Sequence, residues 1–104
     1  MKIHFEQIGR DNKTFDAQID DALLVELGLN PKSANRYGDR RILEMLCVQY
    51  RFLSSKVRGC MMSTPDFDLT KDGKRIGVFA GWHLVGEAWL VRDTATNGKK
   101  GGAA

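Results

Sequence analysis

The stretch RRILEMLCVQYRFLSSKVR, residues Arg40–Arg58, decides the fold because its apolar residues recur with the period of an α-helix. It predicts one helix of about five turns. At about 100° per residue the main apolar stripe contains Ile42, Leu43, Leu46, Cys47, Tyr50, Leu53 and Val57. Met45, Val48 and Phe52 lie on another side, so we expect this helix to be buried on two sides at the centre of the fold.

The composition suits one modest domain. The chain has 104 residues, of which 42% are hydrophobic, so it can bury a real but limited core. Its net charge of +3 favours an anionic partner, although 16 basic residues against 13 acidic ones is a small excess. We expect residues 1–94 to form a single compact α+β domain and residues 95–104 a disordered Gly/Lys/Ala tail.

The cysteine content and the N-terminus predict a cytoplasmic protein. The two cysteines, Cys47 and Cys60, are too few for a disulfide framework, and Cys47 lies in the apolar stripe of the predicted helix. Residues Met1 to Gly9 alternate polar and apolar side chains and lack the apolar run of a signal peptide. No segment is long enough to span a membrane.

The rest of the chain predicts two groups of strands around the helical region. Lys2–Ile8 and Thr14–Ile19 flank a turn-rich stretch and form a hairpin with Ile3, Phe5, Phe15, Ala17 and Ile19 on its buried face. A short helix capped by Asp20 or Asp21 ends at Gly28, and Asp39 is a candidate cap for the long helix. Three more strands are expected over residues 66–70, 75–80 and from Gly81 to about Arg92.

The predicted order is therefore ββααβββ, an α+β fold with a mainly antiparallel sheet of about five strands packed on one long and one short helix. Strict alternation in the last strand puts Trp82, Leu84, Gly86, Ala88 and Leu90 on one face, opposite His83, Val85, Glu87, Trp89 and Val91. We expect Trp82, Phe79 and Tyr50 to belong to the core. Trp89 is the aromatic residue expected to be exposed, where it would suit a protein interface.

The segment from Asp20 to Tyr37 loosely resembles a helix-turn-helix motif. In that interpretation Lys32, Ser33, Asn35 and Arg36 project outward with donors suited to phosphates and base edges. The alternative, an ordinary helix followed by a connecting loop, is favoured. Leu24 would crowd the approach of the two helices, and Gly38 ends the second helix after about two turns.

Two further groups of basic residues are candidate binding surfaces. Arg40, Arg51 and Arg58 line one strip of the predicted long helix and could follow a phosphate backbone or an acidic protein face. The alternative, a solvated helix face partly neutralised by Glu44, is favoured. Basic residues also surround the tight turn of the second hairpin, where a merely soluble turn is the favoured interpretation: Lys71, Lys74 and Arg75.

Nothing in the sequence predicts catalysis. The residues that could take part form no local motif: His4, Asp16, His83, Glu87 and the cysteines. His83 and Glu87 would be about 13 Å apart on one strand, too far for a hydrogen-bonded acid and base. There is no Cys-x-x-Cys or His-x-x-x-His pair for a metal. We therefore expect no enzymatic activity, no metal site and no cofactor.

Two hypotheses for function remain. In the first, the protein is a non-catalytic regulator or accessory factor that contacts nucleic acid through Lys32, Asn35, Arg36, Arg40, Arg51 and Arg58. In the second, it is a protein-binding adaptor or inhibitor, like compact proteins carried by phages and mobile elements, that docks through the Trp89 face or the arginine strip. A homodimer formed through the long helix is a further possibility that the sequence leaves open.

Overall fold

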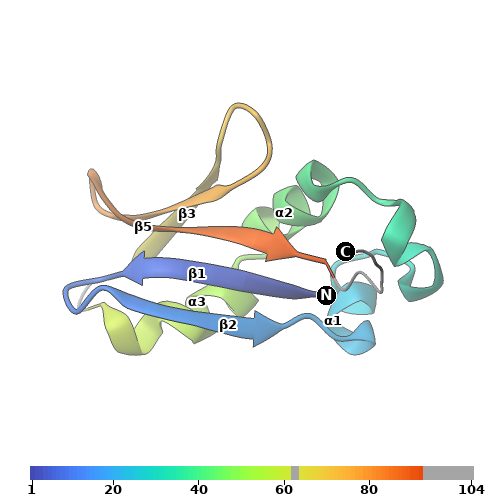
Figure 1. The fold of residues 1–104 in the computed structure, drawn as a ribbon, viewed down its shortest axis with the longest axis horizontal. Coiled ribbons are helices and arrows are strands. Elements are labelled where there is room, and N and C mark those ends of the chain that lie inside the picture. Colours follow the sequence, from blue (N-terminus) through green and yellow to red (C-terminus); the bar gives the residue numbers. More distant parts are fainter. Residues whose placement is uncertain (62–63, 93–104) are drawn as a thin grey trace, which may run out of the picture.

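The computed structural model describes residues 1–61 and 64–92, which form an α+β fold with a five-stranded antiparallel sheet (Figure 1). The strands are β1 (Lys2–Ile8), β2 (Lys13–Gln18), β3 (Pro65–Leu69), β4 (Ile76–Ala80) and β5 (His83–Val91). The helices are α1 (Asp21–Glu26), η1 (Pro31–Arg36), α2 (Asp39–Val48), α3 (Arg51–Val57) and η2 (Arg58–Cys60). The predicted class and sheet are thus confirmed, whereas the tail predicted for residues 95–104 lies outside the described residues.

The strand order is β2-β1-β5-β4-β3, so the first and last strands of the chain pair in the middle of the sheet. The first hairpin has the predicted buried face, since Ile3 lies opposite Ala17 and Phe5 opposite Phe15. On its other edge β1 pairs with β5, which places Ile3 opposite Leu90. The central pairing therefore joins residues that are more than eighty positions apart in the sequence.

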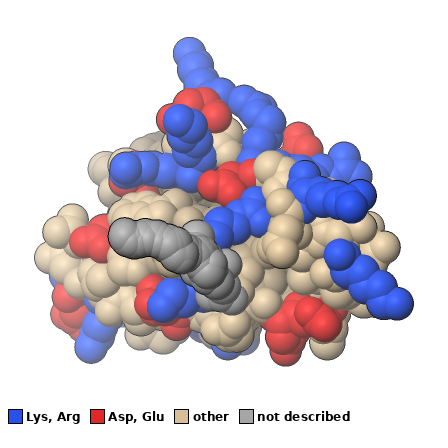
Figure 2. All heavy atoms as spheres, turned by 45° about the vertical axis from the view of Figure 1, so that its right-hand side comes forward, with Lys and Arg blue, Asp and Glu red and all other residues tan. Residues whose placement is uncertain are grey.

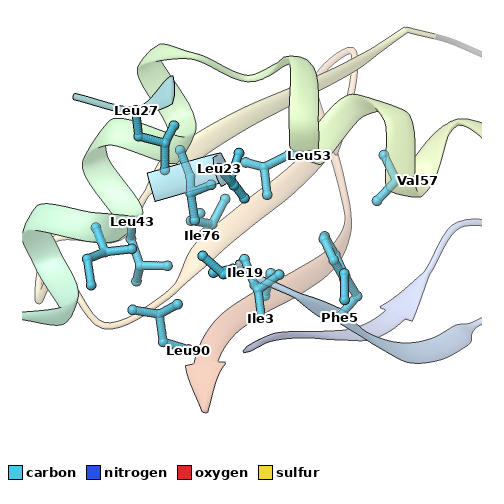
Figure 3. Packing of buried hydrophobic residues seen from close by; sticks show 14 of the residues in the cluster. Ile3, Phe5, Ile19, Leu23, Leu27, Leu43, Leu53, Val57, Ile76 and Leu90 are labelled. Atoms are coloured by element: carbon cyan, nitrogen blue, oxygen red, sulfur yellow. The ribbon is translucent and has the colours of Figure 1, made fainter. Parts of the chain in front are cut away.

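The helices cover one face of the sheet, and the core lies between the two layers (Figure 1). Figure 3 shows helix residues Leu43, Leu53 and Val57 facing sheet residues Ile3 and Phe5 across this core. All five are fully buried. No helix in residues 1–61 and 64–92 is long and apolar enough to cross a membrane. The opposite face of the sheet carries no covering layer in the described part of the chain.

The predicted long helix over Arg40–Arg58 is wrong, because the chain breaks it into α2 and α3. Gln49 leaves the helical region, with φ −106° and ψ 67°. The residues of the main stripe that face the sheet stay buried, but Val48 is 66% exposed and Tyr50 57% exposed. Of the second apolar side, Met45 and Phe52 pack against the edge of the core, and only Val48 is left exposed. Val and Tyr are also weaker helix formers than Leu or Met, which lowers the cost of a break here.

The start of α2 also differs from the prediction. Its N-cap is Gly38, without a side-chain cap, and Asp39 is the first helical residue. The Asp39 carboxylate instead accepts two hydrogen bonds from the Arg92 guanidinium, at 2.8 and 3.0 Å. The Asp39 carboxylate thus forms a charge-assisted pair with Arg92, at the end of β5, and does not cap the helix.

The short helix α1 forms as predicted. The Asp20 carboxylate accepts a hydrogen bond from the Leu23 amide at 2.8 Å and caps the N-terminus. At the other end Gly28 has φ +81°, the amide of Gly28 donates to Val25, and the amide of Leu29 donates to Leu24. This is the Schellman arrangement, which satisfies the last carbonyls of the helix.

The segment after α1 is the 3-10 helix η1, which has no buried residue and ends at an extended Tyr37. The Tyr37 hydroxyl accepts from the Asn30 amide at 2.9 Å and closes the segment on itself. A 3-10 helix of six residues is shorter than the recognition helix of a helix-turn-helix motif, and its hydrogen-bond geometry is poorer. The segment therefore agrees with the favoured interpretation, in which an ordinary helix is followed by a connection.

A β-bulge in β5 changes the predicted alternation of that strand. Val78 lies opposite Gly86 but Phe79 lies opposite Leu84, so Val85 is the extra residue. From Gly86 to Val91 the predicted faces are correct, with Ala88 and Leu90 in the core and Trp89 on the open face. Before the bulge they are wrong, because Leu84 joins the open face and Val85 packs against the core.

Candidate functional site

The turn between β3 and β4 docks on the N-terminal end of α2. Arg40 donates from Nη2 to the carbonyl of Lys71 at 2.7 Å. Gly73 lies against the same side chain: its φ is +72°, and a Cβ there would come within 2.6 Å of Arg40 Nε. The turn therefore needs glycine both for its backbone conformation and for this close approach. Residues about thirty positions apart are held side by side as a result.

This docking gathers basic residues from three segments into one surface, which we call the basic surface: Lys32, Arg36, Arg40, Arg41, Lys71, Lys74 and Arg75. Figure 2 shows Lys and Arg side chains covering the top and right of this end of the molecule. All seven residues are exposed. In the described part of the chain only Arg75 among them forms an ion pair, with Glu87 at 3.0 Å. Most of the positive charge is therefore directed at solvent.

One carboxylate lies inside the basic surface. Asp72 accepts hydrogen bonds from the Thr70 hydroxyl at 2.7 Å and the Lys74 amide at 3.0 Å. These bonds, with the nearby Lys74 and Arg75 charges, lower the pKa of Asp72. Asp72 is therefore ionised and shapes the turn while offsetting part of its charge.

Beside the turn is a hollow of about 560 Å³ at the start of α2. Its lining includes Arg40, Lys74, Arg75 and Trp89, together with the acidic residues Asp39 and Asp72. Three basic and two acidic residues thus line this concave site.

Arg92 holds this end of the molecule together and was not identified from the sequence. Besides Asp39, its guanidinium donates to the carbonyls of Tyr37 at 2.6 Å and Ala34 at 3.3 Å. The end of β5 is thereby tied to η1 and to the start of α2, so that Arg36 and Arg40 are displayed from a fixed frame. No local signal announces this role, because the partners of Arg92 are more than fifty residues away.

The structure divides the predicted nucleic-acid residues between two places. Lys32, Asn35 and Arg36 are exposed on η1, next to Arg40 at the start of α2. Arg51 and Arg58 instead line a separate hollow of about 800 Å³ between α1 and α3. The break after Val48 is the reason that the predicted arginine strip is not continuous.

Trp89, the remaining predicted site residue, is half-buried on the open face of the sheet. The ring of His4 on β1 lies 4.8 Å from it, and the Arg75 guanidinium lies 4.8 Å above it from the side of β4. Trp89 is therefore the centre of a packed polar group. His4 lies opposite Trp89 and not near His83, because β1 pairs with the C-terminal half of β5.

His4 is held between two carboxylates. Its Nδ1 lies 2.6 Å from Asp16 Oδ1 and its Nε2 lies 2.7 Å from Glu6 Oε1. Hydrogen bonding to Glu6 and then to Asp16 raises the pKa of His4, and the bond to His4 is the main cause that lowers the pKa of Asp16. The arrangement favours an imidazolium cation whose ring is tilted by 42° against the ring of Trp89.

We expect His4 to make stability depend on pH. A histidine with a raised folded pKa stabilises the fold fully below its unfolded pKa of about 6.5, and that contribution is lost as pH rises through the folded value. The urea midpoint should therefore fall as pH rises above about 6.5. His4→Gln should remove this part of the fall. His83→Gln is the matched control, since the exposed His83 has no carboxylate partner among the described residues; an unchanged profile in His4→Gln would contradict the assignment.

A second concave site lies at the other end of β3, and we call it the aromatic groove: Tyr50, Asp66, Phe67, Asp68, Phe79 and Trp82. Its volume is about 710 Å³. The expectation that Trp82, Phe79 and Tyr50 belong to the core is wrong, because Trp82 is 98% and Tyr50 57% exposed and Phe79 is half-buried outside the core cluster. Gly81, with φ +65°, turns the chain between β4 and β5 and directs Trp82 outward. The Gly81-Trp82 pair at a hairpin turn was the available signal.

The described part of the chain holds no cluster of side chains that fits a metal ion. No group of three or more His, Cys, Asp or Glu side chains within residues 1–61 and 64–92 could hold a metal ion. Burial raises the pKa of Cys47 to about 11, so this thiol is protonated at neutral pH. Comparison of the chain with protein-family models, with curated proteins and with solved structures found no match. The basic surface and the aromatic groove are therefore the two features from which we infer a function.

Proposed function

We propose that the protein is a non-catalytic, nucleic-acid-contacting regulator or accessory factor that binds backbone phosphates with the basic surface. The observation that supports this most is the docking of the β3–β4 turn on Arg40. Each of the three groups of basic residues is by itself a weak indication of phosphate binding. Together they form one surface. Seven basic side chains lie on it, against Asp72 inside it and Glu87, which pairs with Arg75.

The side chains of this surface suit phosphates better than base edges. Arg36 and Arg41 present planar guanidinium groups that can bind a phosphate in a bidentate manner, and Lys71 and Lys74 add mobile point charges at the projecting turn. Asn35 is the member whose amide could read a base. We therefore expect binding with little sequence preference, in which each phosphate contact releases a counterion.

The test is fluorescence anisotropy with labelled single- and double-stranded DNA and RNA of mixed sequence. With about four phosphate contacts, affinity should fall roughly a hundredfold between about 50 and 200 mM salt. Arg36→Ala/Arg40→Ala should weaken binding and lower the salt slope by about two. Because Arg40 also holds the turn, Lys71→Ala/Lys74→Ala is the second variant: it removes the same charge and keeps the Lys71 carbonyl.

Arg51→Ala/Arg58→Ala is the matched control, since it removes two arginines from the hollow beside α3 and leaves the basic surface intact. It should lose far less affinity than either of the other variants. Equal losses in all three would indicate a general effect of net charge and contradict the proposed site. No binding at low salt would contradict the function itself.

A further inference from the structure

We infer that the aromatic groove binds a basic, extended segment of a partner protein, with a Lys or Arg side chain of that segment placed among the aromatic rings. This protein-binding activity is separate from the basic surface and does not depend on the proposed contact with nucleic acid. It gives the protein-binding hypothesis a site other than the Trp89 face.

The groove wraps around the edge of the sheet. Asp66, Asp68 and Phe79 come from the open face, as their pairing with β4 and β5 shows, whereas Tyr50 comes from the helical layer at the α2–α3 break. Between them runs β3, which pairs with β4 and with no other described strand. A segment bound here would thus lie along a free strand edge, where backbone hydrogen bonds add to side-chain contacts.

The rim of the groove exposes large apolar side chains. Trp82 is 98% exposed and Tyr50 57%, and both line the groove. An isolated exposed apolar residue is ordinary, but two beside one concavity that also contains Phe67 and Phe79 form a patch. Trp and Tyr are also the residues that most often dominate binding energy at protein interfaces.

The charge of the groove determines the kind of partner. Asp66 and Asp68 are exposed and have no ion-pair partner among residues 1–61 and 64–92. Cys47 at the groove wall is protonated and adds no charge, and the nearby Asp68 carboxylate contributes to its raised pKa. Two carboxylates beside several aromatic rings favour a cation, by ion pairing and by cation–π attraction. An acidic partner, or nucleic acid, would be repelled.

Charged residues on an edge strand have a competing explanation, since they also prevent sheets from pairing edge to edge. That role requires only charge on the strand. It does not account for the exposed Trp82 and Tyr50 on either side of the edge. The two explanations predict different results for Asp66→Asn/Asp68→Asn: weaker binding of a basic peptide if the carboxylates bind a partner, and self-association if they protect the edge.

The experiment uses the full chain and a capped peptide of alternating Arg and Val residues, with a Glu/Val peptide of the same length as its control. Isothermal titration calorimetry should show saturable binding of the Arg peptide, with a dissociation constant on the order of 100 μM, and none of the Glu peptide. Trp82→Ala and Asp66→Asn/Asp68→Asn should each weaken binding at least about tenfold. Val25→Ala is the matched control, because Val25 is 63% exposed on α1, away from the groove.

Several results would overturn the inference: no binding of the Arg peptide, equal binding of both peptides, or unchanged affinity in Trp82→Ala. Self-association of Asp66→Asn/Asp68→Asn with peptide affinity retained, seen by light scattering, would assign the carboxylates to edge protection. Dimerisation of the unmodified chain that Trp82→Ala abolishes would make a second copy the occupant. Arg36→Ala/Arg40→Ala should keep peptide affinity within about twofold, which separates this result from that of the nucleic-acid test.

Discussion

Replacing Gly9 with alanine is expected to lower the free energy of unfolding by about 2 to 4 kcal/mol. Gly9 follows β1 with φ +74°, a conformation that an L side chain adopts only at a cost. A Cβ there would also overlap the carbonyl oxygen of Cys60 and lie 3.0 Å from its carbonyl carbon. Both obstacles are backbone atoms of η2, so relief requires the chain itself to move. The Gly9 amide also donates to Val85 at 2.9 Å, which links this site to the bulge.

Gly28→Ala is the matched control for this prediction. Gly28 has a similar φ of +81°, but a Cβ there would meet no atom within 4 Å. Gly28→Ala should therefore lower the free energy of unfolding only by the cost of the left-handed backbone conformation, about 1 to 2 kcal/mol. Urea unfolding of both variants measures the difference. Equal losses would show that the contact between Gly9 and Cys60 contributes nothing.

Leu46→Ala is expected to destabilise the protein by about 2 to 5 kcal/mol, because it removes a fully buried side chain and leaves a cavity between α2 and the sheet. Val48→Ala, two residues further on, should change stability by less than about 0.5 kcal/mol, because Val48 is 66% exposed. The pair can be measured by urea or thermal unfolding. A cost for Val48→Ala close to that of Leu46→Ala would contradict the break and favour a helix buried on two sides.

The proposed binding surfaces are neighbours along β3 (Pro65–Leu69). The lining of the aromatic groove continues along the strand to Asp68, three residues before Lys71 of the basic turn. A basic segment in the groove would therefore be repelled in part by the basic surface. Salt should weaken this repulsion, because the screening length is about 8 Å at physiological salt. We therefore expect the two partners to bind together more readily as salt rises.

Local sequence signals were sufficient for most of the secondary structure. Alternation predicted β1 and β2 to within a residue, and Asp20 and Gly28 marked the two ends of α1. The apolar period of Arg40–Arg58 correctly identified Ile42, Leu46 and Leu53 as core residues. The candidate site was less predictable. Lys32, Arg36 and Arg40 could be named as basic residues, but nothing in the sequence indicated that Lys71 would lie beside them.

The sequence by itself determined the strands, the caps and the inward-facing residues, because each depends on a period or a side chain within a few positions. Tertiary structure alone decided the break at Gln49, the bulge at Val85, the pairing of Arg92 with Asp39 and the docking of the β3–β4 turn on Arg40. These features depend on how one sheet face is shared among several helices and on contacts between residues about 30 to 90 positions apart. Such contacts form only when the layers pack, so no local pattern can specify them.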